Sequence, residues 1–241
     1  MPAKKFKTQS YLESIQEWTD ATLMKLNNKK CNYMVFSRSN TEFATRLTVN
    51  NTVIDRVEEQ KVLGIWLSTY LDWQRNTDEL CSKAYSRISM LTKLKYVGTP
   101  QQDLITIYIL FIRSVVEYCS IVWHSSLTSD QKSDIERIQK VSLKVILRER
   151  YVDYESALRE TSLEKLETRR EQKCLKFGFR CLDHPKNRSM FPRNSKNIRY
   201  PTRNKEPFEV NSARTSYYEN SCIPYILRKL NTNFQDKIIT M

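Results

Sequence analysis

The sequence is poor in glycine and histidine and contains no paired aspartates, and each of these absences excludes a class of function. Glycine occurs only 3 times in 241 residues, which argues against glycine-rich phosphate loops and against a sheet-dominated fold with many tight turns. Neither of the two histidines, His124 and His184, has a nucleophile pattern near it, so no catalytic triad is indicated. No Asp-Asp dipeptide occurs anywhere in the chain. The sequence therefore offers no candidate catalytic residue.

Six cysteines are scattered along the chain, and none of them forms a Cys-x-x-Cys motif. The N-terminal stretch Met1–Ser10 is polar and basic and does not read as a signal peptide, so reduced, intracellular thiols are expected, in the nucleus or the cytoplasm. Cys174, Cys181 and His184 suggest a zinc site, but a tetrahedral site needs four ligands and no fourth lies nearby. We therefore expect no metal site in this chain.

One apolar stretch, Leu104–Trp123, is long enough to suggest a membrane span. Arg113 and Glu117 lie inside it, one helical turn apart, and charged side chains within a bilayer carry a high free-energy cost. The pattern favours a buried helix with an internal ion pair over a transmembrane helix, so no membrane partner is expected.

The net charge is +13 at pH 7, with 40 Lys and Arg against 27 Asp and Glu. Such an excess favours a polyanionic partner, most simply nucleic acid, over a small neutral substrate. The charge is concentrated, because the segment Lys165–Lys205 holds 13 Lys and Arg against 3 Asp and Glu. The alternative is a solvated basic surface without a partner, which charge alone does not distinguish from nucleic-acid contact.

The first third of the sequence predicts a helix followed by short strands. Apolar residues recur at helical spacing over Ser10–Leu26, and Ser10 with Glu13 three residues later indicates a capping box. Asn50-Asn51 predicts a two-residue hairpin turn. Three or four strands are expected, at residues 32–37, 47–49, 52–54 and 61–67. We expect these strands to form a small antiparallel sheet with the helix Ser10–Leu26 as its cover.

After Trp73 the pattern changes from strands to helices. The helices expected are Gln74–Tyr96, Gln101–Trp123 with a bend near Tyr118, Asp130–Arg148, Ser162–Leu182 and Pro224–Asn231. The stretch Lys186–Asn211 lacks periodicity and is rich in Pro, Asn, Arg and Lys, so it predicts a basic, partly disordered linker. The expected fold class is α+β, in three parts: a small sheet with its helix at 1–73, a mainly α-helical bundle at 74–184, and a basic tail with a short C-terminal helix at 185–241.

The expected helix Asp130–Arg148 carries a basic stripe. Its cations Arg137, Lys140, Lys144 and Arg148 fall within about 80° of one face at the standard helical pitch, while its apolar residues occupy another face. Regularly placed cations on one helix face suit the phosphate backbone of a nucleic acid, which carries no sequence information. A solvated outer face is the equally open alternative.

Four blocks of sequence, taken in order, carry a resemblance to a known family. They are Ile15–Trp18 with Asn27–Cys31 and Tyr33–Ser37; Val62–Ile65 with Leu71–Trp73; Tyr108–Trp123 with Ile135–Lys140; and Leu163–Arg170 with Ala213–Thr215 and Ile223–Tyr225. In order and spacing, over about nine tenths of the chain, they resemble the second half of the reverse transcriptases of non-LTR (LINE-type) retrotransposons, especially the jockey and CR1-like elements.

The resemblance implies an architecture and a partner. It assigns the first block to the flank of a polymerase palm, the second to a primer-grip hairpin, and the following helices to a thumb, which together grip a nucleic-acid duplex by its backbone. The residues expected to contact nucleic acid are Lys61, Gly64 and Trp66 in the primer grip and Lys83, Arg87, Arg137, Lys140, Lys144, Arg148, Arg169 and Arg170 in the thumb. Gly64 suits a close backbone approach, and a bulge or packing glycine fits the sequence equally well.

The resemblance also indicates what is missing. The family's activity, RNA-directed DNA polymerase, uses two Mg²⁺ ions held by a Tyr-x-Asp-Asp hairpin, which in the family precedes the block that begins here near Tyr11. We therefore expect a truncated transposable-element segment that is inactive alone, holds no cofactor, and has the missing palm and fingers half as a second partner. Tyr151-Val-Asp153-Tyr154 copies three of the four letters, but it lacks the second aspartate and does not lie between apolar strands. The alternative is a non-catalytic module from such an element that binds nucleic acid or another protein.

Overall fold

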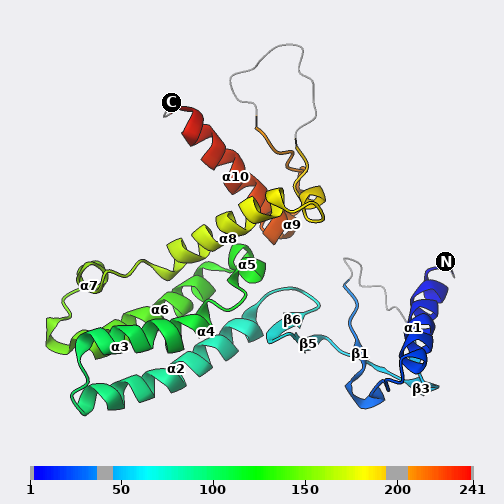
Figure 1. The fold of residues 1–241 in the computed structure, drawn as a ribbon, viewed down its shortest axis with the longest axis horizontal. Coiled ribbons are helices and arrows are strands. Elements are labelled where there is room, and N and C mark those ends of the chain that lie inside the picture. Colours follow the sequence, from blue (N-terminus) through cyan, green and yellow to red (C-terminus); the bar gives the residue numbers. More distant parts are fainter. Residues whose placement is uncertain (1–2, 37–45, 194–205, 240–241) are drawn as a thin grey trace. The chain divides into compact units, whose positions relative to one another are not determined.

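The chain changes from short strands to long helices at Asp72. Met1–Asp72 form one unit and Trp73–Met241 form a second, and Leu71 and Trp73 on either side of the change have positive φ angles of 53° and 62°. The structure, a computed structural model, describes residues 3–36, 46–193 and 206–239 (Figure 1). Helices dominate and are combined with two-stranded sheets, so the fold class is α+β. The expected parts 74–184 and 185–241 both fall within the second unit.

The first unit begins with α1, which spans Ala3–Ala21. The helix expected at Ser10–Leu26 is therefore wrong at both ends. The residues before Ser10 include Ala, Lys and Gln, which are good helix formers and extend the helix backward. The hydroxyl of Ser10 donates to the carbonyl oxygen of Lys7 at 2.9 Å instead of capping the helix. At the other end the helix stops before Leu23, which has a φ of 57°.

Three two-stranded sheets follow α1, instead of the single antiparallel sheet expected. The elements are η1 (Asn28–Lys30), β1 (Asn32–Tyr33), β2 (Thr48–Val49), β3 (Thr52–Val53), β4 (Asp55–Arg56), β5 (Glu59–Val62) and β6 (Ile65–Ser68). β2 and β3 pair across Asn50 and Asn51, whose φ angles of 48° and 58° confirm the predicted turn. β1 pairs in parallel with β4, with Asn32 opposite Asp55. The strand expected at 32–37 is thus shorter, and Ser37 lies outside the described residues.

Helix α1 covers β2. Gln9 anchors it, because its side-chain amide donates to the carbonyl oxygen of Thr48 at 3.1 Å and accepts from the N–H of Thr48 at 3.0 Å. A small core lies beneath the helix. It contains the buried residues Leu47, Val49 and Ile54, with Leu12, Leu26, Cys31 and Tyr33 packed against them.

The stretch expected as one strand at residues 61–67 is a hairpin. β5 and β6, of four residues each, pair antiparallel with Val62 opposite Ile65. Leu63 and Gly64 form the turn, with φ angles of 48° and 87°, and a two-residue turn with both φ angles positive matches the twist of a hairpin. Gly64 is therefore a turn residue at the hairpin tip, rather than a bulge or packing glycine.

The second unit is built from helices (Figure 1). They are α2 (Gln74–Tyr96), α3 (Gln101–Ile107), η2 (Tyr108–Arg113), α4 (Ser114–Val116), α5 (Ser120–Trp123), η3 (His124–Ser126), α6 (Ser129–Leu147), η4 (Arg148–Arg150), α7 (Tyr154–Thr161), α8 (Leu166–Asp183), η5 (Arg188–Met190), α9 (Ser216–Glu219) and α10 (Cys222–Ile239). α2 has the bounds predicted from the sequence. The helix expected from Ser162 begins only at Leu166, because Ser162 has a φ of 54° and ends α7.

The apolar stretch Gln101–Trp123 is interrupted, as the bend expected near Tyr118 indicated. Its middle part, η2, is a π-helix, and the helix then breaks at residues 117–119, where Cys119 has a φ of 48°. No single helix among the described residues is long and apolar enough to cross a membrane. The pieces Gln101–Val116 and Ser120–Ser126, bent by 46°, reach the required length and composition only as a pair.

The C-terminal part of the second unit packs around α8 and α10. Phe191 and Phe208 are buried in the same cluster as the facing residues of these two helices. In the expected linker Lys186–Asn211 these two phenylalanines are buried, most other described residues are exposed, and residues 194–205 lie outside the described residues. α10 extends beyond the predicted Pro224–Asn231 at both ends, with Pro224 in its first turn as predicted.

Gly178 permits the close approach of α8 and α10. A Cβ atom at this position would lie 2.6 Å from Cγ2 of Ile226, a distance shorter than van der Waals contact. Three cysteines share this cluster. Burial raises the pKa of the Cys174 thiol to about 12 and that of the Cys222 thiol to about 11, and it also raises the pKa of Cys181.

Candidate nucleic-acid interface

Three cations of the basic stripe, Arg137, Lys140 and Lys144, lie on the outer face of α6, as their spacing predicts. The fourth, Arg148, was expected to end the helix but follows its last residue, Leu147. Arg137, Lys144 and Arg148 are exposed, and Lys140 is half-buried. The inner face of the helix is buried through Ile135, Ile138, Leu143, Ile146 and Leu147. This inner face fixes the helix against the core, so its three cations are held in a row on a rigid element.

These four cations have no carboxylate partner among the residues that the structure describes. Many other cations of the second unit do have one. The pairs are Lys83 with Glu79, Lys132 with Glu167, Arg150 with Glu160, Lys165 with Glu155, and Lys229 with Glu171. A paired cation is already neutralised, whereas the cations of the α6 stripe keep their full attraction for a polyanion.

Two tyrosines lie beneath the stripe. The ammonium of Lys140 lies 5.1 Å from the centre of the Tyr154 ring, and that of Lys144 lies 5.4 Å from the centre of the Tyr151 ring. Contacts of this kind are worth about 0.5–1 kcal/mol at exposed sites. They limit the conformations of two long side chains without removing their charge.

Tyr154 is anchored by further hydrogen bonds. Its hydroxyl donates to Glu136 and accepts from the side-chain amide of Gln139 at 2.9 Å. Burial raises the pKa of Tyr154, and the hydrogen bond to Glu136 raises it further. Gln139 is fully buried and also accepts from the hydroxyl of Tyr108 at 2.5 Å. Tyr154 is half-buried, and these hydrogen bonds fix the position of α7 against α6.

The last residue of the stripe has an unusual backbone conformation. Arg148 follows α6 with φ 51° and ψ −119°, a region that a side chain bearing a Cβ rarely adopts. A conformation of this kind costs about 1–3 kcal/mol and persists only where the surroundings enforce it. Its N–H donates to the carbonyl oxygen of Lys144, and its carbonyl oxygen accepts from the N–H of Tyr151 at 3.0 Å.

Arg87 and Lys83, predicted as thumb contacts, lie on α2. Arg87 donates to the carbonyl oxygen of Phe111, and its guanidinium lies 4.2 Å from the centre of the Phe111 ring. Lys83 pairs with Glu79 one turn earlier. Both cations therefore have partners within the protein, and neither adds to the α6 stripe.

The three primer-grip residues predicted in the first unit lie on or beside one hairpin. The Lys61 ammonium lies 5.7 Å from the centre of the Trp66 ring, across the β5–β6 pair where the two residues are opposite each other. Gly64 forms the tip of the same hairpin. The structure thus brings these three together on a hairpin, the element that the family resemblance implies and that the pattern of a single strand over 61–67 did not indicate.

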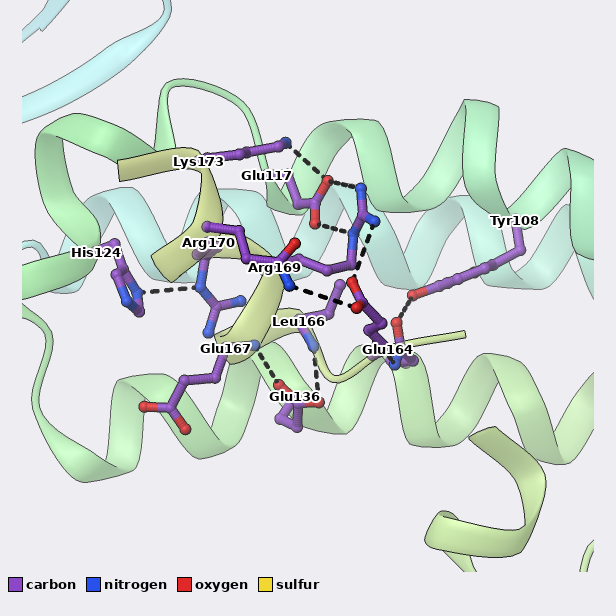
Figure 2. A network of polar contacts seen from close by, with 12 residues as sticks. Tyr108, Glu117, His124, Glu136, Glu164, Leu166, Glu167, Arg169, Arg170 and Lys173 are labelled. Atoms are coloured by element: carbon purple, nitrogen blue, oxygen red, sulfur yellow. Dashed lines mark hydrogen bonds and ion pairs between the residues drawn. The ribbon is translucent and has the colours of Figure 1, made fainter. Parts of the chain in front are cut away.

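Arg169, another predicted contact, is held by a buried carboxylate (Figure 2). Its Nε lies 2.8 Å from Glu117, whose other oxygen lies 2.8 Å from Nζ of Lys173. The ion pair expected between Arg113 and Glu117 is therefore corrected, because α8 supplies both cationic partners. Burial alone would raise the pKa of Glu117, but the hydrogen bonds from Arg169 and Lys173 hold it below its ordinary value.

Arg170 is corrected as a predicted nucleic-acid contact, because it is fully buried. Its Nε donates to Nδ1 of His124 at 3.3 Å (Figure 2), while its two Nη atoms have no hydrogen-bond partner among the residues that the structure describes. His124 is buried as well, and its ring meets that of Tyr225 edge to face at 5.9 Å. Burial and the nearby Arg170 and Lys132 lower the pKa of His124 to about 4.

Glu136 fixes the start of α8 from a distance. One carboxylate oxygen accepts from the N–H of Leu166 at 3.1 Å and the other accepts from the N–H of Glu167 at 3.2 Å (Figure 2). These are N–H groups that have no partner within α8 itself, and a carboxylate there is favoured by the helix dipole. Sequence reasoning missed this cap because 30 residues separate Glu136 from Leu166.

The other residues weighed for chemistry have structural surroundings. Asp153, the aspartate of the partial Tyr-x-Asp-Asp match, caps α7 by accepting from the N–H of Ser156 at 2.9 Å. Cys174 and Cys181 are buried in the apolar cluster between α8 and α10. Within residues 3–36, 46–193 and 206–239, no group of three or more His, Cys, Asp and Glu side chains could hold a metal ion.

A comparison of the chain with protein-family models, curated proteins and solved structures finds no match. The geometry and the charge of the described residues must therefore carry any functional argument.

Proposed function

We propose that the second unit binds the sugar–phosphate backbone of a nucleic acid through the outer face of α6. One observation carries the proposal: Arg137, Lys140 and Lys144 share one face of α6, Arg148 follows directly after the helix, and none of the four has a carboxylate partner among the described residues. At 1.5 Å per residue the three helical cations span about 10 Å. Such a row meets several phosphates in succession and reads no base edges.

The family resemblance supports a more specific form of this proposal. In that form the bundle of α2, α3, α4 and α6 is the thumb of a reverse transcriptase-like protein, and the β5–β6 hairpin with Lys61, Gly64 and Trp66 is its primer grip. The preferred partner is then a primer–template duplex, with a palm and fingers half as a second partner. We propose that this chain alone does not polymerise nucleotides, because it carries no paired aspartates.

The test of backbone binding compares two variants of the full chain with equal charge change. Fluorescence anisotropy with a labelled duplex is measured from 50 to 200 mM salt for the triple change Arg137→Glu, Lys140→Glu and Lys144→Glu. We expect affinity to fall at least about tenfold for every duplex sequence and the salt slope to decrease by about 3.

The matched control reverses three cations elsewhere: Lys7 on α1 and Lys93 and Lys95 on α2. It should leave affinity within about threefold of the unmodified chain. Equal losses of affinity in the two variants would show that binding depends on net charge alone. Unchanged affinity in the α6 variant would move the site elsewhere, first to the basic segment 165–205. No binding of the unmodified chain at low salt contradicts the proposal as a whole.

A second function, protein interaction, is favoured by exposed apolar side chains on the broken helix. Leu110 is 69% exposed, and Phe111, Tyr118 and Val122 are also exposed. Exposed apolar side chains drive association where they gather into one surface. We expect self-association in light scattering that weakens when Leu110 and Val122 are replaced by Ser. A monomer at all concentrations would contradict this second function and leave the first intact.

A further inference from the structure

We propose that Tyr151 is a stacking platform for an unpaired base, so that the α6 face takes single-stranded nucleic acid in preference to a duplex. This inference rests on the proposed backbone-binding function and names the form of ligand that the same face prefers. It puts a single strand in place of the duplex that the family resemblance makes the preferred partner. It is carried by the position of Tyr151 beside the stripe and by the contrast with its neighbour Tyr154.

Tyr151 lies on the short connection between η4 and α7, at the end of the stripe. It is half-buried, and the next residue, Val152, is 81% exposed. Its backbone is fixed, because its N–H donates to the carbonyl oxygen of Arg148 at 3.0 Å. Its hydroxyl has no hydrogen-bond partner among the described residues, whereas the hydroxyl of Tyr154 has two. The hydrogen bonds of Tyr154 thus hold α7 against α6, and the Tyr151 hydroxyl makes no such bond to the described residues.

Among the described residues, the ring of Tyr151 contacts the ammonium of Lys144, which lies 5.4 Å from its centre. At a half-exposed site that contact is weaker than the stacking of a base on an aromatic side chain. A base can therefore replace the ammonium on the ring. The displaced ammonium of Lys144 would stay close to the ring. There it could pair with the phosphate beside the stacked base.

The surrounding charges fit one strand with its base turned inward. Arg148 is exposed three residues before the tyrosine, and Lys144 lies one turn further back. Glu149 is exposed in the same connection and opposes binding, while Arg150 pairs with Glu160 at 3.3 Å. In a duplex the bases are stacked and paired inside the helix, so only phosphates would reach this face. Stacking on Tyr151 therefore strengthens the binding of a single strand and not that of a duplex.

The test uses the full chain and three probes: a 12-nucleotide oligo-dT, an abasic strand of the same length and charge, and a 12-base-pair duplex. For each probe the affinity of a variant is compared with that of the unmodified chain. Tyr151→Ala should weaken binding of oligo-dT by about tenfold and leave the abasic strand and the duplex within about twofold. Tyr151→Phe, which keeps the ring, should retain the affinity for oligo-dT. Urea denaturation of both variants checks that the fold is preserved.

Two outcomes overturn the inference while leaving backbone binding in place. If Tyr151→Ala weakens all three probes equally, the tyrosine only positions Lys144. If it weakens none of them, no base stacks on the ring. In either case the α6 charge-reversal variant should still lose affinity for every probe. If the unmodified chain binds none of the three probes at low salt, the proposed function itself fails.

Discussion

The carboxylate of Glu117 lies 2.8 Å from Nε of Arg169, although 52 residues separate them in the sequence. Glu117 is at the break of the apolar helix, and Arg169 is in the first turns of α8. The contact therefore joins the broken helix to α8, and Lys173 strengthens it from the next turn.

Replacing this carboxylate should be costly. The side chain of Glu117 is only 5% exposed, and Glu117→Gln leaves Arg169 and Lys173 facing a neutral amide. Because both cations are partly exposed, we expect a loss of about 2 kcal/mol in the free energy of unfolding, measured in urea. Glu164→Gln, whose exposed carboxylate lies 3.9 Å from Arg169, is the matched control and should change stability by less than about 0.5 kcal/mol. Equal effects would contradict the assignment.

Stability should fall on acidification because of His124. Its folded-state pKa is lowered to about 4, below the value of about 6.5 in an unfolded chain. The neutral form is therefore the one that the fold favours, so this contribution is complete above pH 6.5 and is lost as the pH falls toward 4. It amounts to at most about 3 kcal/mol. In His124→Asn the free energy of unfolding should depend less on pH over this range, whereas His184→Asn, at an exposed position, should keep the original dependence.

The contact between α8 and α10 should be sensitive to one methyl group. Gly178→Ala places a Cβ atom 2.6 Å from Cγ2 of Ile226. Alanine is the better helix former by about 1 kcal/mol, so the steric cost must exceed this gain, and we expect a net loss of about 1–2 kcal/mol. In an Ile226→Ala background the loss caused by Gly178→Ala should be smaller, which a double-mutant cycle would measure as a favourable coupling. A net gain in stability for Gly178→Ala alone would show that α10 shifts to accommodate the methyl group without a free-energy cost.

Replacing Arg148 by glycine should raise the free energy of unfolding and weaken binding. Arg148→Gly relieves the positive φ of 51° and should raise the free energy of unfolding by about 1 kcal/mol, while removing one phosphate contact. Arg148→Ala removes the same contact but keeps the strain, so it should weaken duplex binding equally without the gain in stability. Urea denaturation and anisotropy measure the two effects. A loss of stability in the glycine variant would mean that the arginine side chain holds the connection in place.

A single substitution in the β5–β6 turn should stabilise the first unit. Leu63 is 88% exposed and has a φ of 48°, whereas asparagine before glycine is the preferred residue in such a turn. Leu63→Asn should raise the midpoint of thermal unfolding of the first unit, by an amount equivalent to about 0.5–1 kcal/mol. Leu63→Ala keeps the strain and serves as the control. If both variants lower the midpoint, the leucine side chain supports the hairpin by packing.

Features with local causes could be predicted from the sequence. The bounds of α2 follow from apolar spacing between Trp73 and the Gly98 turn, and the Asn50-Asn51 turn follows from the tolerance of asparagine for positive φ. The α6 stripe is also local, since its four cations repeat at helical spacing.

Features that depend on distant partners could not be predicted. The parallel pairing of β1 with β4 and the cap that Glu136 provides for α8 each join residues more than 20 positions apart. Arg169 and Arg170 show the same limit at the candidate site. Adjacent residues point about 100° apart on a helix, so only one of the two faces the interior. Which one does so depends on where His124 lies.

The thiols packed between α8 and α10, two of them buried and that of Cys222 half-buried, allow the local opening of this region to be measured chemically. Only the thiolate reacts with alkylating agents, and the raised pKa values of Cys174, Cys181 and Cys222 keep the thiolate rare in the packed state. The rate at which each becomes alkylated therefore follows how often α10 separates from α8. Mass spectrometry of alkylated peptides could then measure how often this local opening occurs, with no engineered cysteine.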